Sequence, residues 1–271
     1  MPKSKHNRKG KSRGGDKRPV ARSGRNEGPV DYRFAQPADG GGMEPIGNNP
    51  RQCPYLDRIA GLSDVFTKDE CTKIIDNALN NWTEKESMIQ RDKPDGKIEQ
   101  NFEEDLDYRN TTLFIPPGPD DWLFDRVLGT INGFNMREDG YGFHIIGLAE
   151  PPNMMRYQAP DLDKHGKPGK YDWHVDVGPG AVPSMRKLSY SILLNPGEYE
   201  GGEFVSKIGR ADVVFENSGD SPDSHDMMHH LDKDLTGTMI LFPSYMLHRI
   251  AEVTKGTRYS LVGWVHGNSF I

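Results

Sequence analysis

The sequence predicts a mainly β fold with flanking helices, in which a jelly-roll (double-stranded β-helix, cupin-like) core carries N-terminal helices packed on one sheet. Short β-rich runs punctuated by Gly and Pro follow one another from residue 108 to residue 266. Apart from one helical segment, no helix separates these runs, and this pattern favours antiparallel strands over a parallel sheet. Two amphipathic helices with clear start signals account for the flanking layer.

Residues 1–45 differ in composition from the rest of the chain. Residues 1–30 hold ten Lys or Arg against Asp16 and Glu27, a net charge of +8, which leaves −14 for the remainder of a 271-residue chain totalling −6. Such a segment has too few apolar side chains to offset the entropy of ordering. We therefore expect a disordered basic tail over 1–45 and one folded domain over 46–271.

The basic tail has two interpretations. Its charge can support a weak contact with nucleic acid or with an acidic partner. Alternatively, it is a solubilising or self-associating tail. The sequence does not separate the two.

The first helix is predicted after Thr67, because Thr67 and Glu70 have the spacing of a capping box. The apolar residues that follow recur with helical period: Cys71, Ile74, Ile75, Ala78, Leu79 and Trp82. We expect one face of this helix to lie against a sheet.

The second helix is predicted to start near Pro119-Asp120-Asp121 and to end in the polar stretch up to Gly140. Its apolar positions are Leu123, Phe124, Val127, Leu128, Ile131 and Phe134. Between the two helices, residues 83–107 are polar and contain Pro94-Asp95-Gly96, so we expect a loop or a weak strand pair there.

The remaining elements are short strands arranged as two facing sheets. They are expected at 108–115, 141–149, 152–158, 187–195, 202–207, 211–216, 237–243, 247–253 and 257–266. Two insertions interrupt them, at 159–170 and 217–235.

Two cysteines, Cys53 and Cys71, are too few for a disulfide framework, and no basic segment followed by an apolar run opens the chain. A cytoplasmic, intracellular location is expected. No apolar stretch approaches the ~20 residues of a membrane span, so we expect no membrane partner.

His174 and Asp176 are the most informative pair of residues. On a strand, side chains at i and i+2 point to the same face, so an imidazole and a carboxylate at this spacing can bind one metal ion together. His248, which begins a predicted strand, supplies a third ligand. Two His and one carboxylate on one face of an octahedral ion leave other positions open, as in non-haem Fe(II) oxygenases.

A second group of histidines, His225, His229 and His230, competes with this interpretation. It lies in a stretch rich in turn-forming residues and lacks a carboxylate two positions away on a clear strand. We interpret it as solvent-facing or structural, with a lid or substrate contact as the alternative. His144 and His165 carry no supporting pattern.

Arg258 follows His248 by ten residues and reads as an anion anchor. Period two places Arg258, Ser260 and Trp264 on one face of a strand, so a guanidinium, a hydroxyl and an aromatic wall converge there. The planar donor fork of arginine suits a carboxylate held at two points.

At this level the chain resembles the prolyl 4-hydroxylase-type (PKHD-like) branch of the Fe(II)/2-oxoglutarate oxygenases. The resemblance spans about residues 60–266 and is most specific over 171–266. The motifs that carry it are His174-x-Asp176, the run Leu188 to Asn195, Tyr199-Glu-Gly-Gly-Glu-Phe204, Gly237 to Ile250 with His248, and Val253 to Arg258 followed by Tyr259 and Trp264.

The resemblance implies roles for these residues. His174, Asp176 and His248 would bind Fe(II), and Arg258 would hold the distal carboxylate of 2-oxoglutarate with help from Ser260. Tyr157 resembles the tyrosine that lines the cosubstrate pocket, although 17 residues separate it from His174 where the family usually has about ten. Tyr190 is a further possibility for holding 2-oxoglutarate.

Two neighbouring activities are disfavoured. A halogenase lacks the carboxylate ligand that Asp176 supplies here. The nucleic-acid demethylase branch carries a second arginine six residues after the first, where this chain has Trp264.

The function that this resemblance implies is an Fe(II)- and 2-oxoglutarate-dependent dioxygenase that hydroxylates a C–H bond with O₂, releases succinate and CO₂, and is supported by ascorbate. The expected substrate is a peptidyl prolyl or other protein residue. Two alternatives stay open: a hydroxylase of a free amino acid or small metabolite, and a non-catalytic jelly-roll module whose basic arm binds nucleic acid or a partner.

Overall fold

The computed structural model describes residues 33–34, 45–46, 58–91, 101–118, 120–208, 211–215 and 234–268. The chain divides into two compact units, Met1–Gln52 and Cys53–Ile271. In the first unit, β1 (Arg33–Phe34) pairs antiparallel with β2 (Pro45–Ile46). The rest of the expected tail, residues 1–32 and 35–44, lies outside the described residues.

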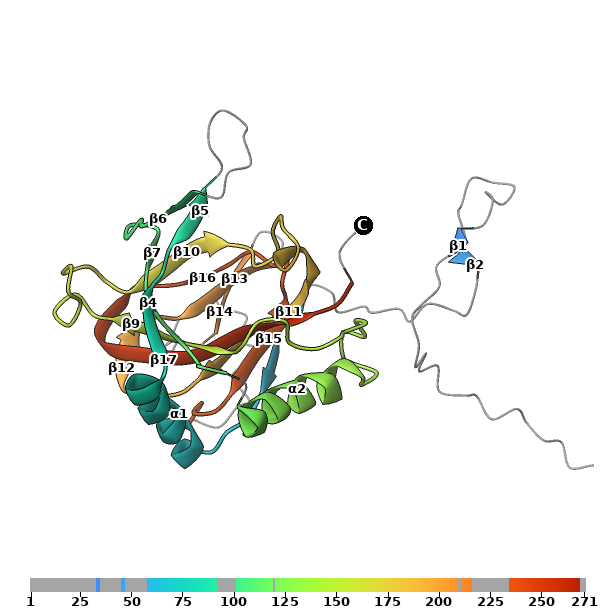
Figure 1. Ribbon diagram of the computed structural model, residues 1–271, viewed down its shortest axis with the longest axis horizontal. Coiled ribbons are helices and arrows are strands. Elements are labelled where there is room, and N and C mark those ends of the chain that lie inside the picture. The colour runs from blue at the N-terminus through green and yellow to red at the C-terminus, as the bar shows by residue number, and fades with distance from the viewer. Residues whose placement is uncertain are drawn as a thin grey trace, which may run out of the picture. The chain divides into compact units, whose positions relative to one another are not determined.

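Two large antiparallel sheets form the core of the second unit (Figure 1). The five-stranded sheet has the order β14-β13-β16-β10-β7, and the eight-stranded sheet has the order β3-β15-β11-β17-β9-β8-β4 with β12 paired to β17. The five-stranded sheet contains β7 (Arg109–Asn110), β10 (Lys170–His174), β13 (Phe204–Ile208), β14 (Ala211–Phe215) and β16 (His248–Ile250). The eight-stranded sheet contains β3 (Ala60–Leu62), β4 (Thr83–Glu86), β8 (Thr112–Ile115), β9 (Asn153–Gln158), β11 (Arg186–Leu193), β12 (Tyr199–Gly201), β15 (Met239–Pro243) and β17 (Val253–His266).

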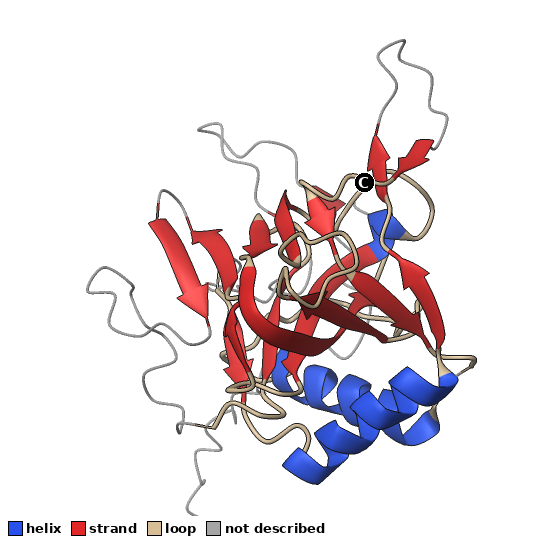
Figure 2. Cartoon of the chain, turned by 90° about the vertical axis from the view of Figure 1, so that its left-hand side faces the viewer, coloured by secondary structure: helices blue, strands red, loops and turns tan. Residues whose placement is uncertain are grey.

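The two predicted helices are confirmed and lie on one side of the strands (Figures 1 and 2). α1 (Lys68–Asn81) begins at the predicted capping box, in which Thr67 Oγ1 accepts from the Glu70 amide and the Glu70 carboxylate accepts from the Thr67 amide. α2 (Asp121–Asn135) starts after Asp120, whose side chain makes no capping hydrogen bond. None of the helices in the described part of the chain is long and apolar enough to cross a bilayer.

The helices bury their apolar faces against the outer face of the eight-stranded sheet, as the helical period predicts. This layer joins residues of both helices with alternate residues of β11 and β17: Cys71, Ile74, Ala78, Leu123, Val127, Ile131, Leu188, Ile192, Leu261 and Val265. Burial of these side chains contributes about 25 cal/mol per Å² of apolar surface. Leu79, which the same period places on the buried face, is instead 42% exposed.

The space between the sheets holds a second apolar cluster. Its members come from strands of both sheets, and include Met155, Tyr157, Leu193, Phe204, Phe242 and Ile250. Strand alternation explains the split, because odd positions of β11 face this interior while even positions face the helices. The expected jelly roll is therefore present, and its interior lies beside the predicted metal ligands.

The strand predicted at 141–149 is wrong. This segment is irregular and makes a single bridge between Gly147 and His266. Gly142 and Gly147 have φ of 69° and 131°, which an extended ladder does not accommodate. The segment is nonetheless fixed to β17, because the Ile146 amide donates to the His266 carbonyl at 2.7 Å and the His266 amide donates to the Gly147 carbonyl at 2.8 Å.

The region expected as a loop or weak strand pair contains both. β5 (Ile89–Arg91) and β6 (Asn101–Glu103) pair with each other as a two-stranded sheet. β4, by contrast, joins the large sheet through β8. The single strand expected at 108–115 is divided between the two sheets as β7 and β8. A 3₁₀ helix, η1 (Pro183–Met185), leads into β11.

Candidate functional site

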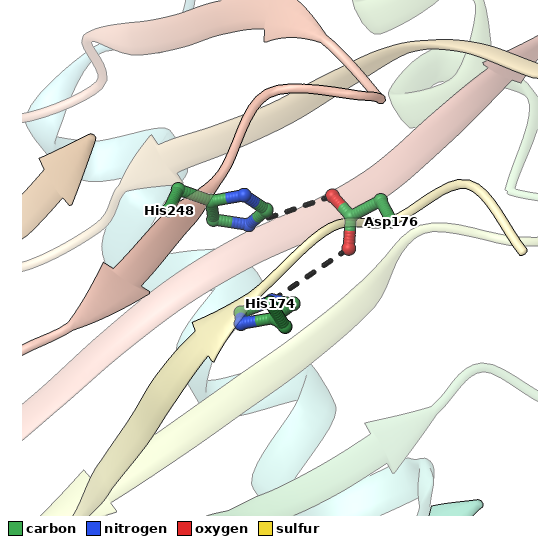
Figure 3. A group of neighbouring side chains, drawn as sticks. All are labelled: His174, Asp176 and His248. Carbon is green, nitrogen blue, oxygen red and sulfur yellow. Dashed lines mark ion pairs between the residues drawn. The ribbon is translucent and has the colours of Figure 1, made fainter. Parts of the chain in front are cut away.

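His174, Asp176 and His248 meet at one point, as the sequence predicts (Figure 3). The Asp176 carboxylate lies 3.7 Å from Nε2 of His174 and 3.6 Å from Nε2 of His248. Their three ligand atoms all lie within 4.8 Å of one another. Within the described ranges, this is the group of His, Cys, Asp and Glu side chains with the geometry to hold a metal ion.

The two histidines come from neighbouring strands, and the aspartate comes from the segment after one of them. His174 ends β10 and is paired with His248 at the start of β16. The expectation that Asp176 also lies on the strand is wrong, because β10 ends at His174. The amides of Asp176 and Val177 donate instead to the carbonyl of Ser244, at 2.9 and 3.1 Å, and this ties the segment to the turn that precedes His248.

Both imidazoles present Nε2 to the shared point. Nδ1 of His174 lies 2.7 Å from the Asp172 carbonyl, and Nδ1 of His248 lies 2.9 Å from the Met246 carbonyl. Because a carbonyl oxygen only accepts, each Nδ1 carries the proton and each Nε2 lone pair is available to a metal. The donor set and its orientation therefore fit a divalent cation.

Burial and charge favour the ligating protonation states. Burial, together with the nearby His248, lowers the pKa of His174 to about 3. Burial alone would raise the pKa of Asp176, but the two histidines, the Ser189 hydroxyl and Arg186 outweigh burial and lower it. At neutral pH, neutral His174 and ionised Asp176 are the forms that bind a metal.

Aromatic rings surround the ligands and limit access of water. Tyr171 stacks on His174 with ring centroids 3.5 Å apart and an interplanar angle of 14°. Phe204 stacks on His248 at 5.4 Å, and Phe242 meets the same imidazole edge-on at 4.7 Å. The ligands line a cavity of about 220 Å³.

The predicted anion anchor, Arg258, does not line the cavity itself but contacts two residues that do, Ser260 and Tyr157. Arg258 is completely buried in β17, and its Nη1 donates to Ser260 Oγ at 2.9 Å. Its guanidinium carbon lies 5.4 Å from the centroid of the Tyr157 ring. Ser260, Tyr157 and Trp264 line the cavity, so the expected strand phase places these residues around one space.

Tyr157 reaches the cavity despite the long interval between it and His174. The 159–170 insertion is closed at its base, because the Gly169 amide donates to the Gln158 carbonyl at 2.7 Å and the Ala159 amide donates to the Gly256 carbonyl at 2.9 Å. The extra residues therefore form a closed loop between β9 of one sheet and β10 of the other. Burial raises the pKa of Tyr157, so its hydroxyl stays protonated at neutral pH.

Tyr190 is placed differently. It belongs to the apolar layer beneath the helices, together with Leu188 and Ile192, and reaches the cavity beside Gly263. Burial raises the pKa of its hydroxyl. The adjacent Ser191 faces the cavity, and its hydroxyl has no protein partner among the described residues.

His225, His229 and His230 lie outside the described residues. His144 and His165 are exposed, and His165 approaches Glu104 at 3.7 Å. Cys71 is buried as a free thiol in the helix-covered layer, and burial raises its pKa to about 12.

Sequence reasoning missed several residues around the ligands. Arg186 lines the cavity and donates from Nη1 to the main-chain carbonyl of Asp176 at 2.9 Å. Arg109 also lines the cavity, with its guanidinium carbon 4.3 Å from the Tyr171 ring centroid. Neither stands in a recognisable short motif, and their contacts join strands that are far apart in the sequence.

Comparison with known proteins finds similarity over the part of the chain that contains His174, Asp176 and His248. Residues 156–266 match the 2OG-Fe(II) oxygenase superfamily. A PKHD-type hydroxylase from Xylella fastidiosa is 34% identical over 125 residues, covering 42% of this chain and 44% of that protein. A PKHD-type hydroxylase from Hyphomonas neptunium is 29% identical over 115 residues, covering 41% and 44%. The matches thus span less than half of the length of these relatives.

The fold is also found among solved structures. A prolyl hydroxylase from Trichoplax adhaerens, solved with a peptide fragment of the hypoxia inducible factor oxygen degradation domain, superposes with a TM-score of 0.51. The superposition covers 77% of this chain and 83% of that one, at 14% identity. It supports the double-stranded β-helix architecture.

Proposed function

We propose, from the match of residues 156–266 to the 2OG-Fe(II) oxygenase superfamily, that the protein is a dioxygenase that hydroxylates a prolyl or other residue of a protein substrate. The observation that carries the proposal is the His174, Asp176 and His248 cluster, with both Nε2 atoms turned to the carboxylate. When bound, Fe(II) with 2-oxoglutarate and O₂ supplies the oxidising chemistry that inserts one oxygen atom into a C–H bond and releases succinate and CO₂.

The chain's own residues bind, orient and shield the reactants. His174, Asp176 and His248 would hold the ion through two Nε2 atoms and a carboxylate oxygen. Arg258 pairs with the distal carboxylate of 2-oxoglutarate, Ser260 adds a hydrogen bond, and Tyr157 and Trp264 form walls of the pocket. Tyr171, Phe204 and Phe242 keep water away from the ligands. Ascorbate would keep the iron reduced.

Exposed apolar side chains beside the ligands favour a protein substrate over a metabolite. Val175, between two ligands, is 44% exposed, and Tyr245 and Leu247, just before His248, are each 38% exposed. The hydrogen bonds from Asp176 and Val177 to Ser244 bring these two segments together. Apolar groups clustered on a surface are typical of contacts with another chain. The Trichoplax prolyl hydroxylase shares this fold and was solved with a peptide fragment, which is consistent with a protein substrate.

The test is mass spectrometry of candidate proteins and peptides incubated with the enzyme, Fe(II), 2-oxoglutarate and ascorbate. We expect one added oxygen on a prolyl or other residue, with stoichiometric succinate, and none with the His174→Ala variant. Consumption of 2-oxoglutarate with free amino acids or small metabolites alone would replace the protein substrate by the metabolite alternative. Failure of the folded protein to bind Fe(II) and 2-oxoglutarate in calorimetry would leave only the non-catalytic module.

Gly202 provides a prediction for the cosubstrate pocket. Its φ is 71°, and a Cβ added there would lie 2.9 Å from Cδ of Arg258 and 2.9 Å from Cγ2 of Val253. Gly202→Ala should displace Arg258 and weaken 2-oxoglutarate binding about tenfold, since a loss of about 1.4 kcal/mol gives that factor.

The matched control is Gly197→Ala. Gly197 has a φ of 88°, but a Cβ there meets no atom within 4 Å. Both variants carry the strain of a left-handed alanine, roughly 1–2 kcal/mol, and only Gly202→Ala touches the anchor. Calorimetric titration with 2-oxoglutarate compares them, and equal affinities would contradict the assigned role of Arg258.

A further inference from the structure

Arg186 connects the metal-ligand segment to the wall of the cavity. One end of its guanidinium, Nη1, donates to the main-chain carbonyl of Asp176 at 2.9 Å. Its carbon lies 3.6 Å from the centroid of the Trp264 ring, which indicates a close cation–π contact. The position of this guanidinium therefore affects both a metal ligand and an aromatic wall.

Glu150 binds the remaining side of the guanidinium. Arg186 Nε donates to Glu150 Oε2 at 2.7 Å, and Nη2 donates to Oε1 at 2.6 Å. This two-point pairing fixes the plane of the fork and leaves Nη1 directed at Asp176. Side-chain exposures of 14% for Arg186 and 26% for Glu150 limit screening by water.

His266 holds Glu150 in turn. The Ala149 amide donates to Nδ1 of His266 at 3.1 Å. Because an amide only donates, Nδ1 is unprotonated and Nε2 carries the proton, which is directed at Glu150 Oε2 at 3.1 Å. His266 is completely buried, and its backbone is bonded to Ile146 and Gly147. The segment that carries Glu150 is therefore anchored at the end of β17.

We propose that Glu150 and His266 are positioning residues, which orient Arg186 and through it hold the Asp176 carbonyl and the Trp264 ring at the metal centre. The role of these residues at a metal rests on the proposed function. The arrangement of Glu150, His266 and Arg186 rests on the hydrogen bonds alone. A salt bridge that merely attached the irregular 141–149 segment to β11 would not affect the Asp176 segment selectively. The distinction can be measured.

The first measurement is amide hydrogen exchange in the metal-free protein. Glu150→Gln keeps the size of the side chain but removes its charge and one of its two acceptor oxygens, so Arg186 loses its two-point pairing. We expect the amides of Asp176 and Val177, which donate to Ser244, to exchange faster while the helix-covered layer stays unchanged. The matched control is Glu84→Gln, which breaks the 2.7 Å pair with Arg156 on the same sheet, away from the ligands.

The second measurement is calorimetric binding of Mn(II), an air-stable probe for Fe(II). Residues that orient metal ligands typically change affinity by 10- to 100-fold, and we expect about tenfold weaker binding for Glu150→Gln. His266→Phe should also weaken binding, because it removes the donor to Glu150. His266→Gln places an amide N–H near the former Nε2 and should restore most of the affinity.

The outcomes separate the two proposals. If Glu150→Gln behaves like Glu84→Gln in both measurements, the positioning role is overturned. If the wild-type protein binds no Mn(II), the proposed function fails. Faster amide exchange confined to Asp176 and Val177 in Glu150→Gln would then still support the role of Glu150 in positioning that segment. Equal Mn(II) affinities of His266→Gln and His266→Phe would exclude His266 from the network.

Discussion

His174→Ala is expected to abolish succinate formation. The substitution removes one of three protein ligands and leaves Asp176 and His248 with too few donors to hold the ion on one face. A bound metal contributes several kcal/mol to catalysis, so the rate should fall by roughly hundredfold or more. Succinate release from 2-oxoglutarate, with and without substrate, measures the loss.

The control for this variant is His144→Ala, which removes an exposed histidine outside the site. It should keep wild-type turnover and Mn(II) affinity. Circular dichroism should show that both variants keep the sheets, because a folded protein is needed for the comparison. Undiminished turnover in folded His174→Ala would show that the cluster is not the catalytic metal site.

The metal ligands could be predicted because their signal is local. His174 and Asp176 are only two residues apart, so their side chains can reach one point whether or not the ladder continues. This explains why the predicted pair comes together although the strand ends at His174. His248 could be predicted because it follows a continuous apolar run, and the register then sets it directly opposite His174.

The positioning network could not be predicted, because its contacts join distant parts of the chain. Arg186 and Glu150 are 36 residues apart, and His266 and Glu150 are 116 apart. The expected strand at 141–149 also concealed Glu150, since a regular strand would not carry the two positive-φ glycines that shape its segment. Contacts between residues so far apart in the sequence can be predicted only when the register of β11 and β17 is known.

Arg258→Met is expected to remove 2-oxoglutarate binding while sparing the metal site. Arg258 is fully buried, and its guanidinium lies beside Ser260 and Tyr157, two residues that line the cavity. Losing one partner of a buried charge pair costs about 2–5 kcal/mol, which corresponds to roughly 30- to 4,000-fold weaker binding. Arg258→Lys keeps the charge but loses the planar set of donors, so its affinity for 2-oxoglutarate should lie between those of the wild type and Arg258→Met.

Three measurements make the expected result specific. Calorimetry should show wild-type Mn(II) affinity and lost 2-oxoglutarate affinity. Thermal unfolding without ligand should show a midpoint close to that of the wild type, because Met removes a charge from the interior together with the cost of burying it. Added 2-oxoglutarate should raise the midpoint of the wild type but not that of the variant, since only a ligand that binds the folded state stabilises it.

Arg156→Met is the matched control for Arg258→Met. Arg156 lies on the adjacent strand β9, opposite Tyr259, and pairs with Glu84 on the other face of the same sheet. Removing it deletes an arginine from the sheet without reaching the cavity, so 2-oxoglutarate should bind as in the wild type. If Arg156→Met and Arg258→Met lose affinity equally, the loss comes from the sheet as a whole. If neither loses it, the cosubstrate carboxylate is held elsewhere, and Arg109, the other arginine described at the cavity besides Arg186, becomes the next residue to replace.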